Sequence, residues 1–161
     1  MTELEHVEDL GSAWLRAWAG ESGFGTCCAH DIQYEDPLAK EPLRGLDALE
    51  QHAARLREAL PDLRIERTGE MLGRGAYACV PWRAAGTHKN GTAALPATNR
   101  FLALHGLHYL ELSDGLIRRA RGFYDLYDAA TQLGILPARG GLGESVLLLL
   151  RGFGLRGQRP T

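Results

Sequence analysis

Two ionisable residues in apolar surroundings are the strongest candidates for chemistry in this 161-residue sequence. Asp36 ends an expected strand over residues 30–36, directly before Pro37, and His108 lies among leucines in a longer expected strand. An aspartate that points into an apolar cavity has a raised pKa and becomes a serviceable proton acceptor. Each residue also has a structural interpretation, Asp36 as a turn residue and His108 as a core histidine with a hydrogen-bond partner. The pair therefore predicts acid–base chemistry if both residues face one cavity.

Alternation along residues 99–112 decides which histidine faces inward. A strand with this pattern places His108 on the same face as Leu104, and it places His105 on the opposite face with Leu107. Asp114-Gly115 then favours a tight hairpin into a last strand. If the leucine-rich face lines the interior, His108 lies inside.

The elements that must position these residues can be read from the apolar periodicity. A capping box at Thr2 and Glu5 predicts a first helix that ends near Gly20, and Trp14 and Trp18 lie on its apolar face as core residues or as walls of a cavity for a flat ligand. The other expected elements are a short helical piece around Cys27 and Cys28, a helix capped by Asp47 with Glu50 and ended by Pro61, strands over 63–72 and 76–85, and a helix over 128–136. This order predicts an α+β fold with helices on one face of a curved antiparallel sheet.

Composition excludes several classes of protein. An apolar fraction of 45% over this length predicts one domain, and a net charge of -2 makes a nucleic-acid partner unexpected. The three cysteines form an odd set with two adjacent members, which favours a reducing cytoplasm, and the acidic N-terminal stretch does not resemble a secretory signal. The longest apolar run, residues 146–150, is far shorter than the ~20 residues of a membrane span, so no membrane partner is expected.

The last residues form a separate segment in this interpretation. We expect the main domain to cover residues 1–138 and a tail to cover residues 139–161, with a short helix over 145–153 that is apolar nearly all round. Its burial against a partner subunit or across the sheet would hide this apolar surface. Together with the outer strand face at Phe101, His105, Leu107 and Tyr109, the tail predicts a homodimer or a larger homo-oligomer.

Motifs for cofactor chemistry are not found. The sequence has no Gly-rich phosphate loop after a strand, no Cys/His cluster with zinc spacing and no nucleophile-elbow serine, so we expect an activity without cofactor or metal. His88 follows Gly86-Thr87 at a strand end and is expected near solvent. Asp125 closes the last strand and is expected to cap the following helix.

Four short stretches together carry a family resemblance. They are Gly86-Thr87-His88, the segment Leu95-Pro96-Ala97-Thr98-Asn99-Arg100, His108 ahead of Asp114-Gly115, and Asp125 with Gln132-Leu133-Gly134. From about residue 5 to residue 136 the chain resembles the SnoaL-like polyketide cyclases, a branch of the nuclear-transport-factor-2-like superfamily that also holds ketosteroid isomerase and limonene epoxide hydrolase. The resemblance implies a cone, in which a curved sheet wraps around the long N-terminal helix and encloses an apolar cavity, and it implies dimers or tetramers.

The resemblance also implies roles for single residues. His108 matches a pocket histidine of the aldol-type cyclases, and Asp36 resembles the general base of ketosteroid isomerase. Two positions depart from the pattern: Gly122 stands where the cyclases and epoxide hydrolases have a catalytic aspartate, and Trp14 stands where the isomerase has an oxyanion-hole tyrosine. The residues expected to bind substrate around Asp36 and His108 are Trp14, Trp18, Tyr34, Leu104, Gly122, Tyr124, Asp125 and His88.

These expectations lead to one preferred function and two alternatives. The preferred function is a cofactor-independent enzyme of secondary metabolism that cyclises or isomerises an apolar or polycyclic, polyketide-like carbonyl substrate. Asp36 would remove a proton α to the carbonyl and His108 would hydrogen-bond the enolate oxygen. The alternatives are an epoxide hydrolase or epoxide-opening cyclase, in which Asp36 activates water or a hydroxyl, and a non-catalytic binding or scaffolding member, which the missing acid at Gly122 favours.

Overall fold

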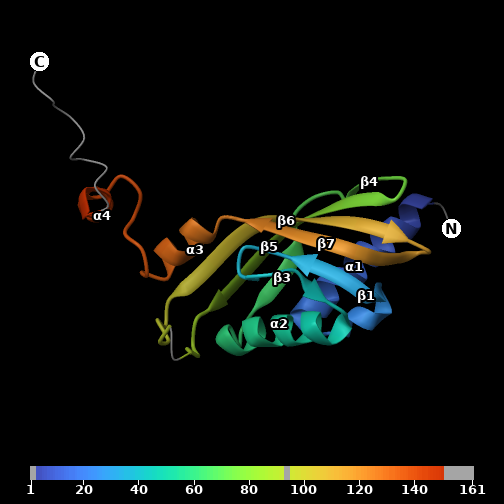
Figure 1. Cartoon of the computed structure of the whole chain (residues 1–161), viewed down its shortest axis with the longest axis horizontal. Coiled ribbons are helices and arrows are strands. Elements are labelled where there is room, and N and C mark those ends of the chain that lie inside the picture. The colour runs from blue at the N-terminus through green and yellow to red at the C-terminus, as the bar shows by residue number, and fades with distance from the viewer. Residues whose placement is uncertain (1–2, 93–94, 151–161) are drawn as a thin grey trace, which may run out of the picture.

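The computed structural model describes residues 3–92 and 95–150, with the side chains of residues 3–5, 147 and 149 left out. A curved seven-stranded sheet has the strand order β2-β1-β7-β6-β5-β3, with β4 paired to β5, and α1 and α2 lie against one of its faces (Figure 1). The neighbouring strands are antiparallel except for β1 (Cys28–Glu35) and β7 (Leu116–Tyr124), which run parallel. The predicted α+β class is confirmed.

Helix α1 (Glu3–Ala19) supplies much of the core because apolar residues recur at helical spacing along it. Trp14 is fully buried and Trp18 is 3% exposed, and both belong to the large core cluster between the helices and the sheet. The predicted helix is confirmed. Its predicted capping box lies outside the described side chains.

Strands β6 (Phe101–Ser113) and β7 form the hairpin on which the site depends. Asp114 and Gly115 both adopt positive φ, 53° and 76°, as a tight connection requires. The alternation along β6 is as predicted: His108 is buried and faces the helices, whereas His105 is exposed on the outer face. The hairpin therefore carries His108 into the core.

Two predicted elements differ from the structure in type or number. The short helical piece is a 3-10 helix, η1 (Phe24–Thr26), and Cys28 already belongs to β1. The expected strand over 63–72 is two strands, β3 (Arg64–Arg67) and β4 (Leu72–Arg74), both paired to β5 (Tyr77–Thr87). The break between β3 and β4 lies opposite Pro81 of β5. Proline has no N–H to donate across the ladder, so the pairing is interrupted there.

Helix α2 (Leu46–Ala59) begins without the predicted capping box. Its N-cap is Gly45, which makes no side-chain cap, and Asp47 lies within the first turn. The Glu50 carboxylate is used elsewhere, because it accepts a 2.7 Å hydrogen bond from the Phe24 N–H. The helix ends before Pro61, as predicted, and β2 (Leu43–Arg44) precedes it.

The C-terminal elements stand at one end of the sheet. Helix α3 (Leu126–Gln132) follows β7, and Asp125 caps it by accepting a hydrogen bond from the Asp128 N–H, as predicted. Helix α4 (Leu142–Leu150) lies beyond α3, away from the sheet (Figure 1). Residues 151–153 of the predicted helix over 145–153 lie outside the described residues. The alternative that this helix is buried across the sheet is wrong, because Val146 and Leu150 are 53% and 82% exposed. Within the described part of the chain, no helix is long and apolar enough to cross a membrane.

Candidate active site

Five rings from four elements meet in the core and form what we call the ring cluster: Trp14 and Trp18 of α1, Tyr34 of β1, Trp82 of β5 and His108 of β6. Each of the five side chains is at most 5% exposed. The ring cluster therefore brings α1, β1, β5 and β6 together at one place in the core.

His108 lies between two indoles. Its ring stacks on Trp18 at 5.7 Å and on Trp82 at 5.2 Å between centroids, and Trp14 meets it edge-on at 5.4 Å. Trp82 can lie this close to β6 because its partner there is Gly106, where a Cβ would come within 2.2 Å of the indole. The orientation of His108 is thus set by packing.

Burial keeps His108 neutral. Loss of hydration lowers the pKa of His108 from its ordinary value of 6.5 to about 3, and the nearby Asp36 charge acts in the opposite direction with a smaller effect. Its Nδ1 has no hydrogen-bond partner among the protein groups that the structure describes. A neutral imidazole can donate one hydrogen bond, but it does not supply a cation at neutral pH.

Asp36 lies beside the ring cluster and has four hydrogen-bond donors around its carboxylate. Oδ1 accepts from the Leu38 and Ala39 N–H groups, both at 2.8 Å, as in an Asx-turn. Oδ2 accepts from the Tyr34 hydroxyl at 3.1 Å and from His52 Nε2 at 2.8 Å. The turn role and the interior position, which were alternatives from the sequence, therefore coexist.

The prediction that burial raises the pKa of Asp36 is wrong. Desolvation acts in that direction, but the His52 hydrogen bond, the His52 charge and the two backbone N–H groups together lower the pKa of this carboxyl below its usual value. The same partners hold the carboxylate in place, and only 3% of its side chain is exposed. Asp36 is thus an orienting anion and a poor proton acceptor.

His52 is the functional candidate that the sequence interpretation missed. It lies on α2 on the face that also carries Leu49, Ala53 and Leu56, and 13% of its side chain is exposed. Its ring lies 6.1 Å from Trp18 and 5.9 Å from Tyr34 between centroids. The signal that could have found it is its spacing of three residues after Leu49 and four before Leu56, which puts a histidine on the inward face of the helix.

Gly122 of β7 is the point where Asp36 and His108 approach each other. A Cβ built on Gly122 would lie 2.7 Å from the Tyr34 hydroxyl oxygen, 3.3 Å from Asp36 Cβ and 3.4 Å from His108 Cδ2. Gly122 pairs with His108 across the β6–β7 ladder, and the parallel β1–β7 pairing brings Tyr34 opposite Ala120. The absent side chain at position 122 leaves the space that the Tyr34 hydroxyl occupies.

We expect Gly122→Ala to lower the free energy of unfolding by about 1–3 kcal/mol, because the new methyl group overpacks against Tyr34. Urea denaturation measures the loss. Gly69→Ala is the matched control, since its Cβ would meet only the Pro81 ring at an ordinary 3.7 Å. In a Tyr34→Phe background the cost of Gly122→Ala should shrink, and an unchanged unfolding midpoint for Gly122→Ala alone would contradict the packing argument.

Three indole N–H groups in the ring cluster have no partner among the described protein groups. They are the Nε1 atoms of Trp14, Trp18 and Trp82, all buried. Buried polar groups are nearly always hydrogen-bonded in native proteins, and each one left alone costs about 1–3 kcal/mol. These three N–H groups are therefore candidate donors for the acceptor oxygens of a ligand.

The remaining predicted pocket residues divide into two groups. Leu104 and Tyr124 pack against the core, and Tyr124 meets Trp82 at 5.9 Å between ring centroids. Burial, with the Asp36 charge second, raises the pKa values of Tyr34 and Tyr124, so both phenols stay neutral. Asp36 and His108 both face the interior, and their opening onto a shared cavity stays a prediction.

His88 and Asp125 have their hydrogen bonds elsewhere. The expectation that His88 is near solvent is wrong, because it is 5% exposed and its Nδ1 accepts a 3.2 Å hydrogen bond from the Thr98 N–H. Asp125 is exposed, caps α3 and pairs with Arg139 at 3.1 Å. Among the residues described, no three His, Cys, Asp or Glu side chains gather as a metal site would require.

Comparison with known proteins identifies the family to which this chain belongs. The model of the SnoaL-like polyketide cyclase family matches residues 10–133, more than half of the chain. The chain belongs to this family. The ring cluster and the Asp36–His52 pair both lie in the part of the chain that this family model covers. No curated protein sequence matches the chain at a significant level.

Solved structures share the fold at low sequence identity. TsrD from Streptomyces laurentii is 19% identical with a TM-score of 0.73, and the match covers 84% of this chain and all of that chain. A candidate SnoaL-like polyketide cyclase from Jannaschia sp. CCS1 is 15% identical with a TM-score of 0.74, over 85% of this chain and 98% of that one. IdmH from Streptomyces antibioticus, a candidate polyketide cyclase, is 20% identical with a TM-score of 0.66, and the match covers 79% of this chain and 97% of that chain. These likenesses support the SnoaL-like fold.

Proposed function

We propose that this SnoaL-like chain is a cofactor-independent enzyme that moves a proton on a flat, apolar carbonyl substrate and so cyclises or isomerises it. The observation that carries the proposal is the Asp36–His52 pair, 2.8 Å between Oδ2 and Nε2, beside a neutral His108 and a donor-rich ring cluster. Membership of a family of polyketide cyclases supports a polyketide-like substrate.

His52 is the proposed general base, in place of Asp36. The ionised Asp36 carboxylate accepts the proton on Nε2, so the second ring nitrogen, Nδ1, is the basic one. Histidine is the side chain that most often serves as a general base, and a carboxylate behind it orients the ring and stabilises the imidazolium that forms. Its 13% exposure against 3% for Asp36 supports the same assignment.

The donors of the ring cluster are proposed to stabilise the enolate. A hydrogen bond from neutral His108 or from an indole N–H to the carbonyl oxygen strengthens as negative charge develops there. In a buried site such donors need no reorganisation during the reaction, and they act with little screening by water. The flat rings of Trp18 and Trp82 also match the shape of a flat substrate.

The proton and electron balance closes without a further reactant. His52 takes the proton from the carbon α to the carbonyl, and the C–H electron pair becomes the enolate. In an isomerisation, His52 returns the proton to another carbon. In a cyclisation, the enolate carbon bonds to a second carbonyl carbon of the same molecule, and the oxygen of that carbonyl takes the proton from His52. Epoxide opening is less well supported, because it needs an acid where Asp36 is ionised and His108 is neutral.

The test is deuterium exchange on a probe ketone. With 2-tetralone in D2O, the wild-type chain should accelerate loss of the α-proton NMR signal over buffer that contains the same concentration of free imidazole. Quenching of tryptophan fluorescence measures binding of the probe independently, because the ring cluster holds all three tryptophans. Exchange at the background rate with the probe bound would contradict the proposed chemistry.

A further inference from the structure

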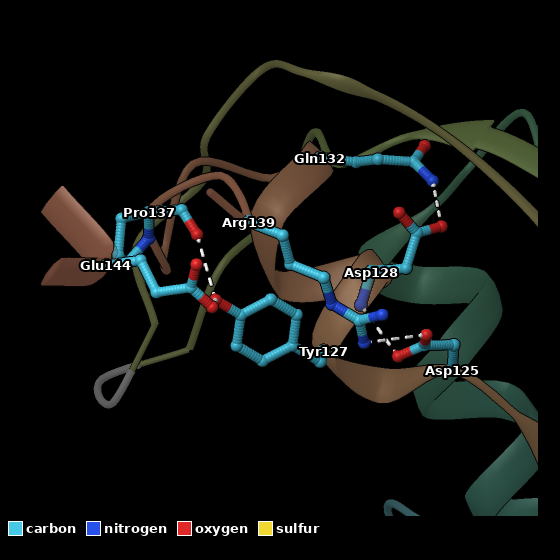
Figure 2. A network of polar contacts seen from close by, with 7 residues as sticks. All are labelled: Asp125, Tyr127, Asp128, Gln132, Pro137, Arg139 and Glu144. Carbon is cyan, nitrogen blue, oxygen red and sulfur yellow. Dashed lines mark hydrogen bonds and ion pairs between the residues drawn. The ribbon is translucent and has the colours of Figure 1, made fainter. Parts of the chain in front are cut away.

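Two adjacent thiols, Cys27 and Cys28, are reactive groups that the proposed mechanism does not use. They differ from the polar network around α3, whose charged groups pair with each other (Figure 2). There Arg139 donates to Asp125 at 3.1 Å, and its guanidinium lies 4.7 Å from the centre of the Tyr127 ring. That network supports the fold, whereas the two thiols form a candidate site.

The backbone before β1 brings the two sulfur atoms together. Adjacent side chains of a regular strand point to opposite faces, but Cys27 precedes β1 and has φ -137° and ψ -11° at the end of η1. Its Sγ lies 3.7 Å from Cys28 Sγ, and one thiol donates a hydrogen bond to the other. Both residues are buried, 0% and 3% exposed. The two thiols are therefore in direct contact within the core.

This contact makes the two thiols unequal. The hydrogen bond from Cys28 lowers the pKa of the Cys27 thiol below its ordinary value of 9.0, although burial opposes this effect. The same hydrogen bond, together with burial, raises the pKa of the Cys28 thiol. The thiolate is the reactive form of cysteine. Cys27 is therefore the nucleophile of the pair, and Cys28 is the thiol that resolves its oxidised form.

The pair lies directly after an exposed turn. Gly25 and Thr26 of η1 are exposed and precede Cys27 in the chain. This single 3-10 turn is held by the Cys27 N–H, which donates to the Phe24 carbonyl oxygen at 3.0 Å, and by few other backbone contacts. Short exposed segments open locally at a lower free energy than the core. A small oxidant can therefore reach the sulfur atoms when the turn opens.

We propose that Cys27 and Cys28 are a modification site, a dithiol pair that hydrogen peroxide converts to a disulfide, and that this disulfide slows the proposed reaction. The Cys27 thiolate attacks one oxygen of the peroxide, the O–O bond breaks, and a sulfenic acid and hydroxide form. Hydroxide takes the proton that Cys27 released. The Cys28 thiol then attacks the Cys27 sulfur, the S–O bond breaks, and the hydroxyl group leaves with the Cys28 proton as water. The two thiols lose two electrons, and one peroxide becomes two waters.

The disulfide in this pair is strained and easily reduced. Consecutive Cα atoms lie about 3.8 Å apart across a trans peptide, whereas ordinary disulfides join Cα atoms about 4.4–6.8 Å apart. Strained disulfides have higher reduction potentials and are the labile, regulatory ones. A mild thiol should therefore reverse the modification.

Phe24 connects the pair to the proposed active site. The Cys27 thiol donates to the Phe24 carbonyl oxygen at 3.6 Å, and the disulfide has no S–H to make this contact. The Phe24 ring meets Trp18 of the ring cluster edge-on at 5.4 Å between centroids. Its N–H donates to Glu50 of α2, the helix that carries His52. The slower reaction rests on the proposed function, whereas formation of the disulfide does not.

The first test counts free thiols after treatment of the full chain with hydrogen peroxide. The oxidised chain, denatured, should take one iodoacetamide label in place of three, and dithiothreitol should restore all three. Cys79→Ser is the matched control, because only Cys27 and Cys28 remain. It should go from two labels to none as a monomer. Three labels on the oxidised wild type, or two on oxidised Cys79→Ser, would overturn the proposal.

Exchange on 2-tetralone measures the effect on the site. Oxidised Cys79→Ser should exchange about tenfold more slowly or less, because small displacements of positioned groups cost much in rate, and dithiothreitol should restore the rate. Cys28→Ser forms no disulfide and should keep its own rate under peroxide, which controls for oxidation of methionine. The thiol count does not need this variant, so it stands where a buried serine weakens the fold.

The outcomes separate the two parts of the proposal. An unchanged exchange rate after complete disulfide formation would overturn the regulation of the site. Absence of exchange by the untreated wild type would contradict the proposed function and with it the regulation, whereas the thiol count still decides whether the disulfide forms.

Discussion

His52→Gln should slow α-proton exchange on 2-tetralone by about 10²–10⁴-fold, the usual contribution of a positioned general base. Glutamine can still donate a hydrogen bond to Asp36, so the carboxylate keeps its partner while the basic nitrogen is lost. Binding of the probe, measured by fluorescence quenching, should change little. The effect then falls on the rate of exchange and not on affinity.

The pH profile distinguishes His52 from Asp36 as the base. Hydrogen bonds keep the pKa of Asp36 below its usual value of 3.8, so an Asp36 base predicts a flat exchange rate between pH 5 and 8. A rate that changes with pH in this range would exclude Asp36 as the base. Asp36→Asn should also lower the rate, because it removes the anion that orients His52, and this loss alone does not separate the two assignments.

The control for His52→Gln is His30→Gln, which changes an exposed histidine on β1 and should leave exchange at the wild-type rate. Wild-type exchange by His52→Gln together with a flat pH profile would assign the base to Asp36. Loss of probe binding in His52→Gln would instead mean that His52 contributes mainly to the shape of the site.

The second large effect is a dependence of stability on pH caused by His108. The unfolded chain protonates this imidazole below pH 6.5, whereas burial in the folded chain holds its pKa at about 3. The contribution of His108 to the free energy of unfolding is therefore fully present above pH 6.5. It falls as the pH drops toward 3, by about 1.4 kcal/mol per pH unit. Between pH 6.5 and 4.5 we expect a loss of roughly 2–3 kcal/mol from this residue.

Urea denaturation at pH 7, 5.5 and 4.5 measures this loss, with His108→Phe as the comparison. Phenylalanine keeps a ring between Trp18 and Trp82 and cannot titrate, so its unfolding free energy should depend much less on pH. Asp36 does not affect this comparison. Its pKa is lowered in the folded chain, so its contribution to the free energy of unfolding is lost only when the pH falls below its ordinary pKa of 3.8. Parallel losses in the wild type and in His108→Phe would contradict the buried neutral imidazole.

Local sequence patterns were enough to predict much of this fold. Alternation along β6 identified His108 as the inward histidine, and the Asp36-Pro37 step marked the end of β1 within one residue. These features depend on the pleat and on the steric restriction before proline, which are local. The family resemblance supplied the cone, which the periodicity of the chain alone does not specify.

The predictions that failed depend on contacts between distant segments. Asp36 has a lowered pKa because His52, sixteen residues later, and the following loop donate to it. The predicted cap with Glu50 failed because the Phe24 N–H, twenty-six residues earlier, takes that carboxylate. A sequence pattern gives the type and face of a side chain, but it does not give the partner that reaches it through the fold.

Gly122 constrains how the acid–base group of this fold could change by mutation. The family resemblance implies an aspartate at this position, yet any Cβ there would collide with the Tyr34 hydroxyl, which donates to Asp36. An aspartate at position 122 would therefore overpack against a tyrosine at position 34 unless that side chain shifts. The order in which a shorter residue 34 comes first avoids an overpacked intermediate, whereas the reverse order passes through one. Among homologues, a side chain at position 122 should accompany a smaller residue at position 34.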